Sequence, residues 1–144
     1  MTKPFSSADY RALAEFRFQL RTFLHFSERA AREHGIEPQQ HQLLLACRGL
    51  PEGSRPTIGT LAQRLCIEHH SAVALVDKLE ASELVQRVPS PLDRREVLVQ
   101  ITKRGESLLA GLSQLHSAQA AQVGPRLIEA LAAVLQAHEL HEPR

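Results

Sequence analysis

The chain has 144 residues, a length that suits one domain and is short for an enzyme with separate cofactor and substrate sites. Its 17 basic and 16 acidic residues give a formal net charge of +1, so charge alone does not indicate a nucleic-acid-binding protein. No apolar run is long enough to cross a bilayer and no secretory signal opens the chain, so we expect a cytoplasmic protein.

The first predicted element is one long helix over residues 6–34. Apolar residues recur there at three- and four-residue intervals without proline or glycine, and Gly35 stands where the helix should end. Ser6 or Ser7 is suited to cap its start, and Asp9 is favourable in its first turn. The apolar face is longer than one small domain needs, so we expect part of it to contact a second chain in a dimer.

A second helix is expected to begin at Pro38, because proline is tolerated in the first turn of a helix. It should end before the proline- and glycine-containing segment 50–56. The apolar stripe between these limits consists of Leu43, Leu44, Ala46 and Cys47.

Two short helices with a tight turn between them follow, which is the pattern of a helix-turn-helix. Thr57 is suited to cap the first of them, and Cys66, Ile67 and Glu68 form the turn. The first helix has its apolar face at Ile58, Leu61, Ala62 and Leu65, and the second at Val73, Val76, Leu79 and Leu84.

The second of these helices has a small or polar face that can enter a DNA major groove. The residues expected to contact DNA are His69, His70, Ser71, Ala72, Ala74 and Lys78. The first three can donate to bases or phosphates, the alanines can contact a thymine methyl, and the lysine can reach a phosphate. The alternative is an ordinary solvated helix face.

Residues 84–88 and 97–101 are rich in β-branched side chains and predict two strands. The proline-containing loop between them carries Asp93, Arg94 and Arg95 at its tip. Asp93 can hold one guanidinium through a charge-assisted hydrogen bond and leave the other free to enter a narrow minor groove. A solvated turn is the alternative.

After the hairpin, Thr102 is suited to cap a helix that runs to about residue 123. Gly124 and Pro125 should interrupt it, and a last helix should follow. The predicted order is therefore four helices, two strands and two helices.

The motifs, read in chain order, resemble those of the MarR (multiple antibiotic resistance regulator) family. The resemblance is carried by Gly35-Ile36-Glu37-Pro38-Gln39-Gln40, LAQRL at 61–65, Ser71-x-Val73, LVDKLE at 75–80, LVQR at 84–87, Asp93-Arg94-Arg95 and Ile101-Thr102-x-x-Gly105. The chain departs from the family at Glu83, where the family usually has glycine. Glycine tolerates the left-handed conformation that ends many helices, and glutamate resists it.

The resemblance implies a single domain over residues 1–144 that is mainly α with a small β-hairpin wing. A winged helix-turn-helix at about 38–102 would be flanked by dimerisation helices at about 6–34 and 103–141. It further implies a homodimeric, DNA-binding transcription regulator and not an enzyme. By resemblance, such a protein is most often a repressor that a small molecule releases from a pseudo-palindromic operator, and its wing uses Asp93 and Arg95.

The family commonly has an effector pocket where the first helix meets the winged part, often for aromatic and anionic molecules. Arg17, Arg21 and His25 succeed one another at four-residue intervals on that helix, so they can present positive charge to a carboxylate or phenolate. The alternative is that they are surface residues paired with Glu15 or Glu28.

Three other interpretations remain open. Cys47 and Cys66 are expected to be buried thiols, and the alternative is a thiol-based redox switch at either one. The eight histidines show no standard zinc spacing, so no metal and no cofactor is expected. The contrasting class is a winged-helix module that binds protein without reading DNA.

Overall fold

The computed structural model describes residues 3–142, which pack as two compact units. The terminal unit is formed by both ends of the chain, up to Arg29 and from Gln114 onward. The winged unit is formed by Ala30–Ser113. The helices α1, Ser7–Glu33, and α5, Lys103–Glu139, each contribute to both units. That the two units form one domain, as the length suggests, stays a prediction.

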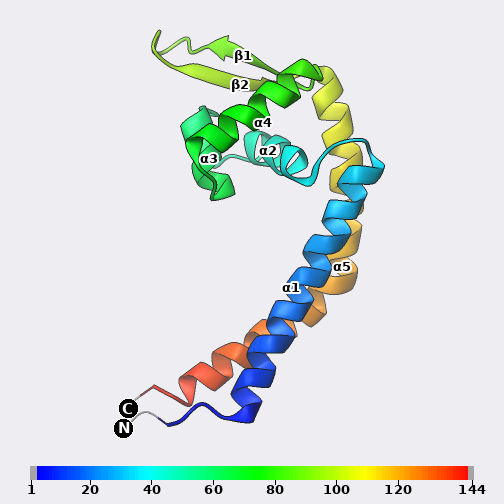
Figure 1. Ribbon diagram of the computed structural model, residues 1–144, viewed down its shortest axis with the longest axis vertical. Coiled ribbons are helices and arrows are strands. Elements are labelled where there is room, and N and C mark those ends of the chain that lie inside the picture. The colour runs from blue at the N-terminus through cyan, green and yellow to red at the C-terminus, as the bar shows by residue number, and fades with distance from the viewer. Residues whose placement is uncertain (1–2, 143–144) are drawn as a thin grey trace. The chain divides into compact units, whose positions relative to one another are not determined.

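In the terminal unit α1 and α5 lie side by side (Figure 1). Polar contacts join them. The side-chain amide of Gln119 donates to the carbonyl oxygen of Phe23 at 3.5 Å, and His116 Nε2 contacts Ser27 Oγ. His141 Nε2 lies 2.9 Å from Asp9 Oδ2. These contacts set the pairing of the two helices.

The start of α1 is closed by a capping box. The Ser6 backbone N–H donates to Asp9 Oδ2 at 2.7 Å, and the Asp9 N–H donates to Ser6 Oγ at 3.2 Å. These hydrogen bonds pair two N–H groups at the helix start. The predicted cap at Ser6 is therefore confirmed.

The winged unit contains three helices and a hairpin. They are α2, Pro38–Arg48; α3, Ile58–Leu65; α4, His69–Ala81; β1, Val85–Pro89; and β2, Val97–Ile101. The strands are antiparallel, with Val85 opposite Ile101 and Pro89 opposite Val97, and they lie beside α4 (Figure 1). Pro38 opens α2 and the Thr57 hydroxyl caps α3, both as predicted.

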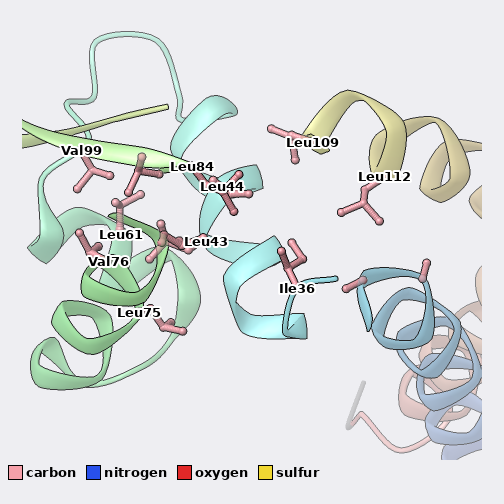
Figure 2. Packing of buried hydrophobic residues seen from close by; sticks show 14 residues of the cluster. Ile36, Leu43, Leu44, Leu61, Leu75, Val76, Leu84, Val99, Leu109 and Leu112 are labelled. Atoms are coloured by element: carbon pink, nitrogen blue, oxygen red, sulfur yellow. The ribbon is translucent and has the colours of Figure 1, made fainter. Parts of the chain in front are cut away.

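Figure 2 shows how the winged unit buries its core: side chains of α2, α3, α4 and the hairpin meet between the elements. Leu43, Leu44, Leu61, Val76 and Leu79 are fully buried there. The first turns of α5 extend the same cluster through Leu109 and Leu112. This packing holds α4 rigidly from one side, because native cores are close-packed.

The exit from α4 is left-handed at Glu83, whose φ is 60°. The Leu84 N–H donates to the Leu79 carbonyl at 2.9 Å, and the Glu83 N–H donates to the Glu80 carbonyl at 3.0 Å, which is a Schellman motif. The Thr102 hydroxyl donates to the Glu83 carbonyl at 2.7 Å. Glutamate therefore adopts the conformation for which the family usually has glycine.

The predicted break at Gly124 and Pro125 is wrong, since α5 continues through Pro125. A proline inside a helix removes one hydrogen bond, but Gln119 before it and Ala130 after it are both buried within the terminal unit. Packing on both sides keeps the helix continuous. In the part of the chain that the structure describes, neither this helix nor any other is long and apolar enough to cross a membrane.

Candidate nucleic-acid interface

One face of α4 is buried and the other is open. The buried residues are Ala72, Leu75, Val76 and Leu79, at the three- and four-residue spacing of a single helix face. His70, Ala74 and Lys78 follow one another at four-residue intervals and are all exposed. His69 is also exposed, and Ser71 is half-buried. An exposed stripe of polar and small residues therefore runs along α4, and we call it the α4 stripe, His70–Ala74–Lys78.

Ala72 does not belong to this surface, although the sequence pattern suggested a contact with a thymine methyl. Its relative exposure is 0%, because it points into the core of the winged unit. Contact with DNA would require the side chain to leave that core. The other five predicted residues of α4 retain some exposure.

The tip of the hairpin is a closed turn organised by Asp93. Asp93 Oδ1 accepts the Arg95 backbone N–H at 2.9 Å, and the Glu96 N–H donates to the Asp93 carbonyl at 3.1 Å. Aspartate commonly stabilises turns by such a bond to the residue two places later. The sequence predicted that Asp93 would hydrogen-bond an arginine side chain, whereas in the structure its carboxylate hydrogen-bonds the backbone N–H of Arg95.

Arg94 and Arg95 are both exposed at this tip. Among residues 3–142, no carboxylate pairs with either guanidinium and no side-chain hydrogen bond engages it. Two uncompensated positive charges on a loop tip suit an anionic partner such as a phosphate backbone or a narrow minor groove.

The hairpin is held to α4 by Arg87. Its Nη2 lies 2.6 Å from Asp77 Oδ1, its Nη1 lies 2.9 Å from Glu80 Oε1, and its backbone N–H donates to Glu80 Oε2 at 2.8 Å. The hydrogen bonds from Arg87 lower the pKa of Glu80, and the bond from the Arg87 backbone N–H contributes most. The pKa of Arg87 is raised, chiefly by its hydrogen bond to Asp77. This arginine therefore compensates two acidic groups of α4 and is not free for DNA.

A contact that the sequence did not indicate ties the segment before α3 to the wing. Arg55 Nη1 lies 2.7 Å from Glu96 Oε2, and the Val99 N–H donates to the Pro56 carbonyl at 2.9 Å. The two charges are far apart in the chain, so no local pattern could have paired them. Arg55 therefore compensates the charge of Glu96, the acidic residue that follows Arg95 in the chain.

Arg17, Arg21 and His25 lie on α1 and are exposed. The predicted alternative, pairing with Glu15 or Glu28, is not seen within residues 3–142, and Glu15 accepts a hydrogen bond from Gln19 instead. Two cavities of the terminal unit are lined by other residues. The three residues thus form a basic stripe, and their role in effector binding stays a prediction.

The two cysteines differ. Cys47 is half-buried and its thiol donates to the Val99 carbonyl at 3.2 Å. Burial raises the pKa of Cys47 to about 11, and Glu106 adds to the increase, so this thiol is a poor source of thiolate. Cys66 is exposed at the left-handed end of α3, with φ of 56°, so the expectation that both thiols are buried is wrong for it.

In the described residues no group of three side chains is placed to hold a metal ion.

Residues 34–96 match the sequence profile of the MarR family. Over 87 residues the chain is 32% identical to the HTH-type transcriptional regulator MhqR of Bacillus subtilis, a match that covers 60% of this chain and 58% of that regulator. A second regulator of the same organism is covered over 51% of its length. The chain thus spans little more than half of these curated relatives.

Solved structures have the same fold. AbsC, a MarR family transcriptional regulator from Streptomyces coelicolor, has a TM-score of 0.71 at 19% identity, covering 85% of this chain and 82% of AbsC. A mutant of S. aureus MepR bound to an oligodeoxyribonucleotide has a TM-score of 0.63 at 17% identity, with 85% and 88% covered. CouR from Rhodococcus jostii bound to p-coumaroyl-CoA has a TM-score of 0.61 at 24% identity, with 70% and 69% covered.

The family profile spans the part of the winged unit that contains α2, α3, α4 and the wing tip, where most of the motifs lie. The curated relatives are transcriptional regulators and the solved structures have the winged-helix fold. Sequence and fold therefore agree: residues 34–96 match the MarR family profile, and the chain has the winged-helix fold of AbsC, a MarR family transcriptional regulator.

Proposed function

We propose that this protein binds duplex DNA as a transcription regulator, with α4 in the major groove and the hairpin tip in the adjacent minor groove. The observation that carries the proposal is that the winged unit presents both the exposed α4 stripe and the exposed Arg94 and Arg95, whose guanidinium groups have no partner within residues 3–142. A helix fits the major groove, and arginine is favoured in narrow minor grooves. The MepR mutant, which has the same fold and is bound to an oligodeoxyribonucleotide, supports DNA as the partner.

The DNA-binding form is a homodimer in this proposal. The terminal unit exposes large apolar side chains that a soluble monomer would leave in water. The most exposed of them on α1 and α5 are Tyr10 at 64%, Phe18 at 58%, Ile128 at 71% and Leu135 at 56%. A two-fold dimer would bind a pseudo-palindromic operator with half-sites about 10 bp apart.

The regulator acts as a repressor whose DNA affinity falls when a small aromatic anion binds. CouR binds p-coumaroyl-CoA, which supports a ligand with an aromatic group and negative charge. The exposed Arg17, Arg21 and His25 are candidates for contacting it. A ligand shifts the DNA equilibrium only by its different affinities for the free and DNA-bound forms.

The experiment selects DNA sequences bound by the full chain and measures affinity for the selected operator at several salt concentrations. Phosphate contacts predict an affinity that falls steeply with salt. Arg95→Ala should weaken operator binding about tenfold or more, because a minor-groove guanidinium is lost, while the unfolding midpoint stays unchanged. Asp93→Ala should have a milder effect through a looser turn.

Arg11→Ala is the matched control, because Arg11 is an exposed arginine of the terminal unit. It should leave operator affinity unchanged. Full operator affinity in Arg95→Ala would remove the wing from the proposed contact. Failure to select any DNA would favour a winged-helix module that binds protein.

A further inference from the structure

The loop at the tip of the hairpin closes at Glu96, next to the two arginines that it carries. The Ser90 N–H donates to the Glu96 carbonyl at 3.0 Å, and the Glu96 N–H donates to the Asp93 carbonyl at 3.1 Å. Ser90 is only 5% exposed, so this end of the loop is anchored in the winged unit. Arg94 and Arg95, which we call the tip arginines, immediately precede Glu96.

The side chain of Glu96 is held from outside the hairpin. Arg55 Nη1 lies 2.7 Å from Glu96 Oε2, and the Glu96 side chain is only 17% exposed. The backbone around Arg55 is itself fixed, because the Arg55 carbonyl accepts the Thr57 N–H at 2.8 Å and the Pro56 carbonyl accepts the Val99 N–H at 2.9 Å. The guanidinium therefore reaches Glu96 from a segment that is hydrogen-bonded to β2.

Without Arg55, the carboxylate of Glu96 would have to find another cation. A half-buried carboxylate without a partner is unfavourable, because water solvates it only in part. The tip arginines are the nearest cations in the sequence, and within the described part of the chain, residues 3–142, neither guanidinium has a partner. An arginine that pairs with a carboxylate is less available to DNA, since that pair must first be broken.

We propose that Arg55 is a positioning residue for DNA binding, because it holds the Glu96 carboxylate and so keeps the tip arginines available to DNA. Arg55 acts through Glu96, and its own guanidinium stays on that carboxylate when DNA binds. This inference rests on the proposed function, in which the hairpin tip enters the minor groove. The pairing of the tip arginines in the free protein does not depend on that function.

The test is a double-mutant cycle that measures affinity of the full chain for the operator selected with wild type. Arg55→Gln should bind this operator about tenfold more weakly, because the released carboxylate competes with DNA for the tip arginines. Glu96→Gln should bind at least as tightly as wild type, since the competing charge is removed. In the Glu96→Gln background, Arg55→Gln should change the affinity by no more than about twofold, because Arg55 then has no carboxylate to hold.

Two comparisons separate this role from a merely structural one. The ion pair is partly exposed, with the Arg55 side chain 46% accessible, so Arg55→Gln should leave the urea unfolding midpoint close to that of wild type. Arg48→Gln is the matched control. It removes another exposed arginine of the winged unit and releases Glu106, 3.3 Å away, which belongs to α5 and not to the hairpin. Operator affinity should be unchanged in Arg48→Gln.

The pairing of the tip arginines can be measured without DNA. Their guanidinium N–H signals in NMR spectra, assigned with Arg94→Ala and Arg95→Ala, exchange more slowly with water when the guanidinium is hydrogen-bonded to a carboxylate. Both signals should exchange rapidly in wild type and in Glu96→Gln. In Arg55→Gln at least one of them should exchange severalfold more slowly, and adding Glu96→Gln should restore rapid exchange.

Any of three results would overturn the role of Arg55. These are full operator affinity in Arg55→Gln, an equal loss with and without Glu96, as expected of an arginine that contacts a phosphate directly, and rapid exchange of both tip arginines in Arg55→Gln. If wild type selects no DNA, the proposed function fails, and the exchange measurement by itself decides whether Arg55 keeps Glu96 from the tip arginines. If wild type binds its operator through Arg95 and Arg55→Gln binds it equally well, this inference fails alone.

Discussion

At the scale of single residues, Glu83 holds a left-handed conformation, φ 60°, that costs a non-glycine residue about 1 kcal/mol or more. Glu83→Gly should therefore stabilise the protein by roughly 0.5 to 1 kcal/mol, after allowing for the extra freedom of glycine in the unfolded chain. Its contact with Arg104 at 3.9 Å joins two exposed side chains and contributes little. Urea unfolding at neutral pH measures the difference.

The neighbouring residue provides a matched control for this prediction. Ser82 has φ of −88°, which any residue adopts, so Ser82→Gly gains no relief of strain and should destabilise. If Glu83→Gly is as destabilising as Ser82→Gly, the left-handed exit is not a source of strain in this protein.

At the scale of elements, Asp9 joins the start of α1 to the turn that follows α5 in the terminal unit. Its carboxylate accepts from the Ser6 backbone N–H, the Ser6 hydroxyl and His141 Nε2. These bonds, the Ser6 backbone bond first, lower the pKa of Asp9 from 3.8 to about 2. Because the folded-state pKa is the lower one, the stabilisation is complete above pH 3.8 and is lost as the pH falls toward 2.

Asp9→Asn should therefore be less stable than wild type at neutral pH, and this difference should shrink as the pH falls from about 4 to about 2. The urea midpoint of both proteins, measured across this pH range, tests the expectation. Glu28→Gln removes an exposed carboxylate from the same helix and should show no such convergence. A difference between wild type and Asp9→Asn that does not change with pH would contradict the capping role of the Asp9 charge.

At the scale of the whole molecule, the proposed dimer depends on apolar side chains of the terminal unit. Ile128 and Leu135 are exposed at spacing seven, two turns apart on one face of α5. Replacing both by aspartate should weaken dimerisation at least about a hundredfold, because each buried aliphatic side chain contributes roughly 1.5 to 3 kcal/mol. Sedimentation equilibrium should show dimers of wild type and monomers of the double variant at micromolar concentration.

Gln136→Asp places the same charge on an exposed position beside that face and should leave the dimer intact. Operator affinity should fall with the dimer, because one winged unit contacts only one half-site. A double variant that remains dimeric would place the interface elsewhere.

Features that depend on a few neighbouring residues could be predicted from the sequence by itself. The capping box of Ser6 and Asp9, the end of α1 at Gly35, the Thr57 cap and the strand at Val97–Ile101 all follow from short-range hydrogen bonds and backbone preferences. These local patterns in the right order were also enough to indicate the winged-helix fold.

Only the tertiary structure decided which side chains are buried and which charged groups are paired. Periodicity could not show that Ala72 points into the core, because small residues suit either face of a helix. Pro125 stays helical because buried neighbours on both sides hold α5 in place, and packing outweighs the lost hydrogen bond. Arg87, Arg55 and Arg95 look alike in the sequence. Only the folded chain brings carboxylates to the first two, whereas no carboxylate of the described residues 3–142 pairs with the third, at the wing tip.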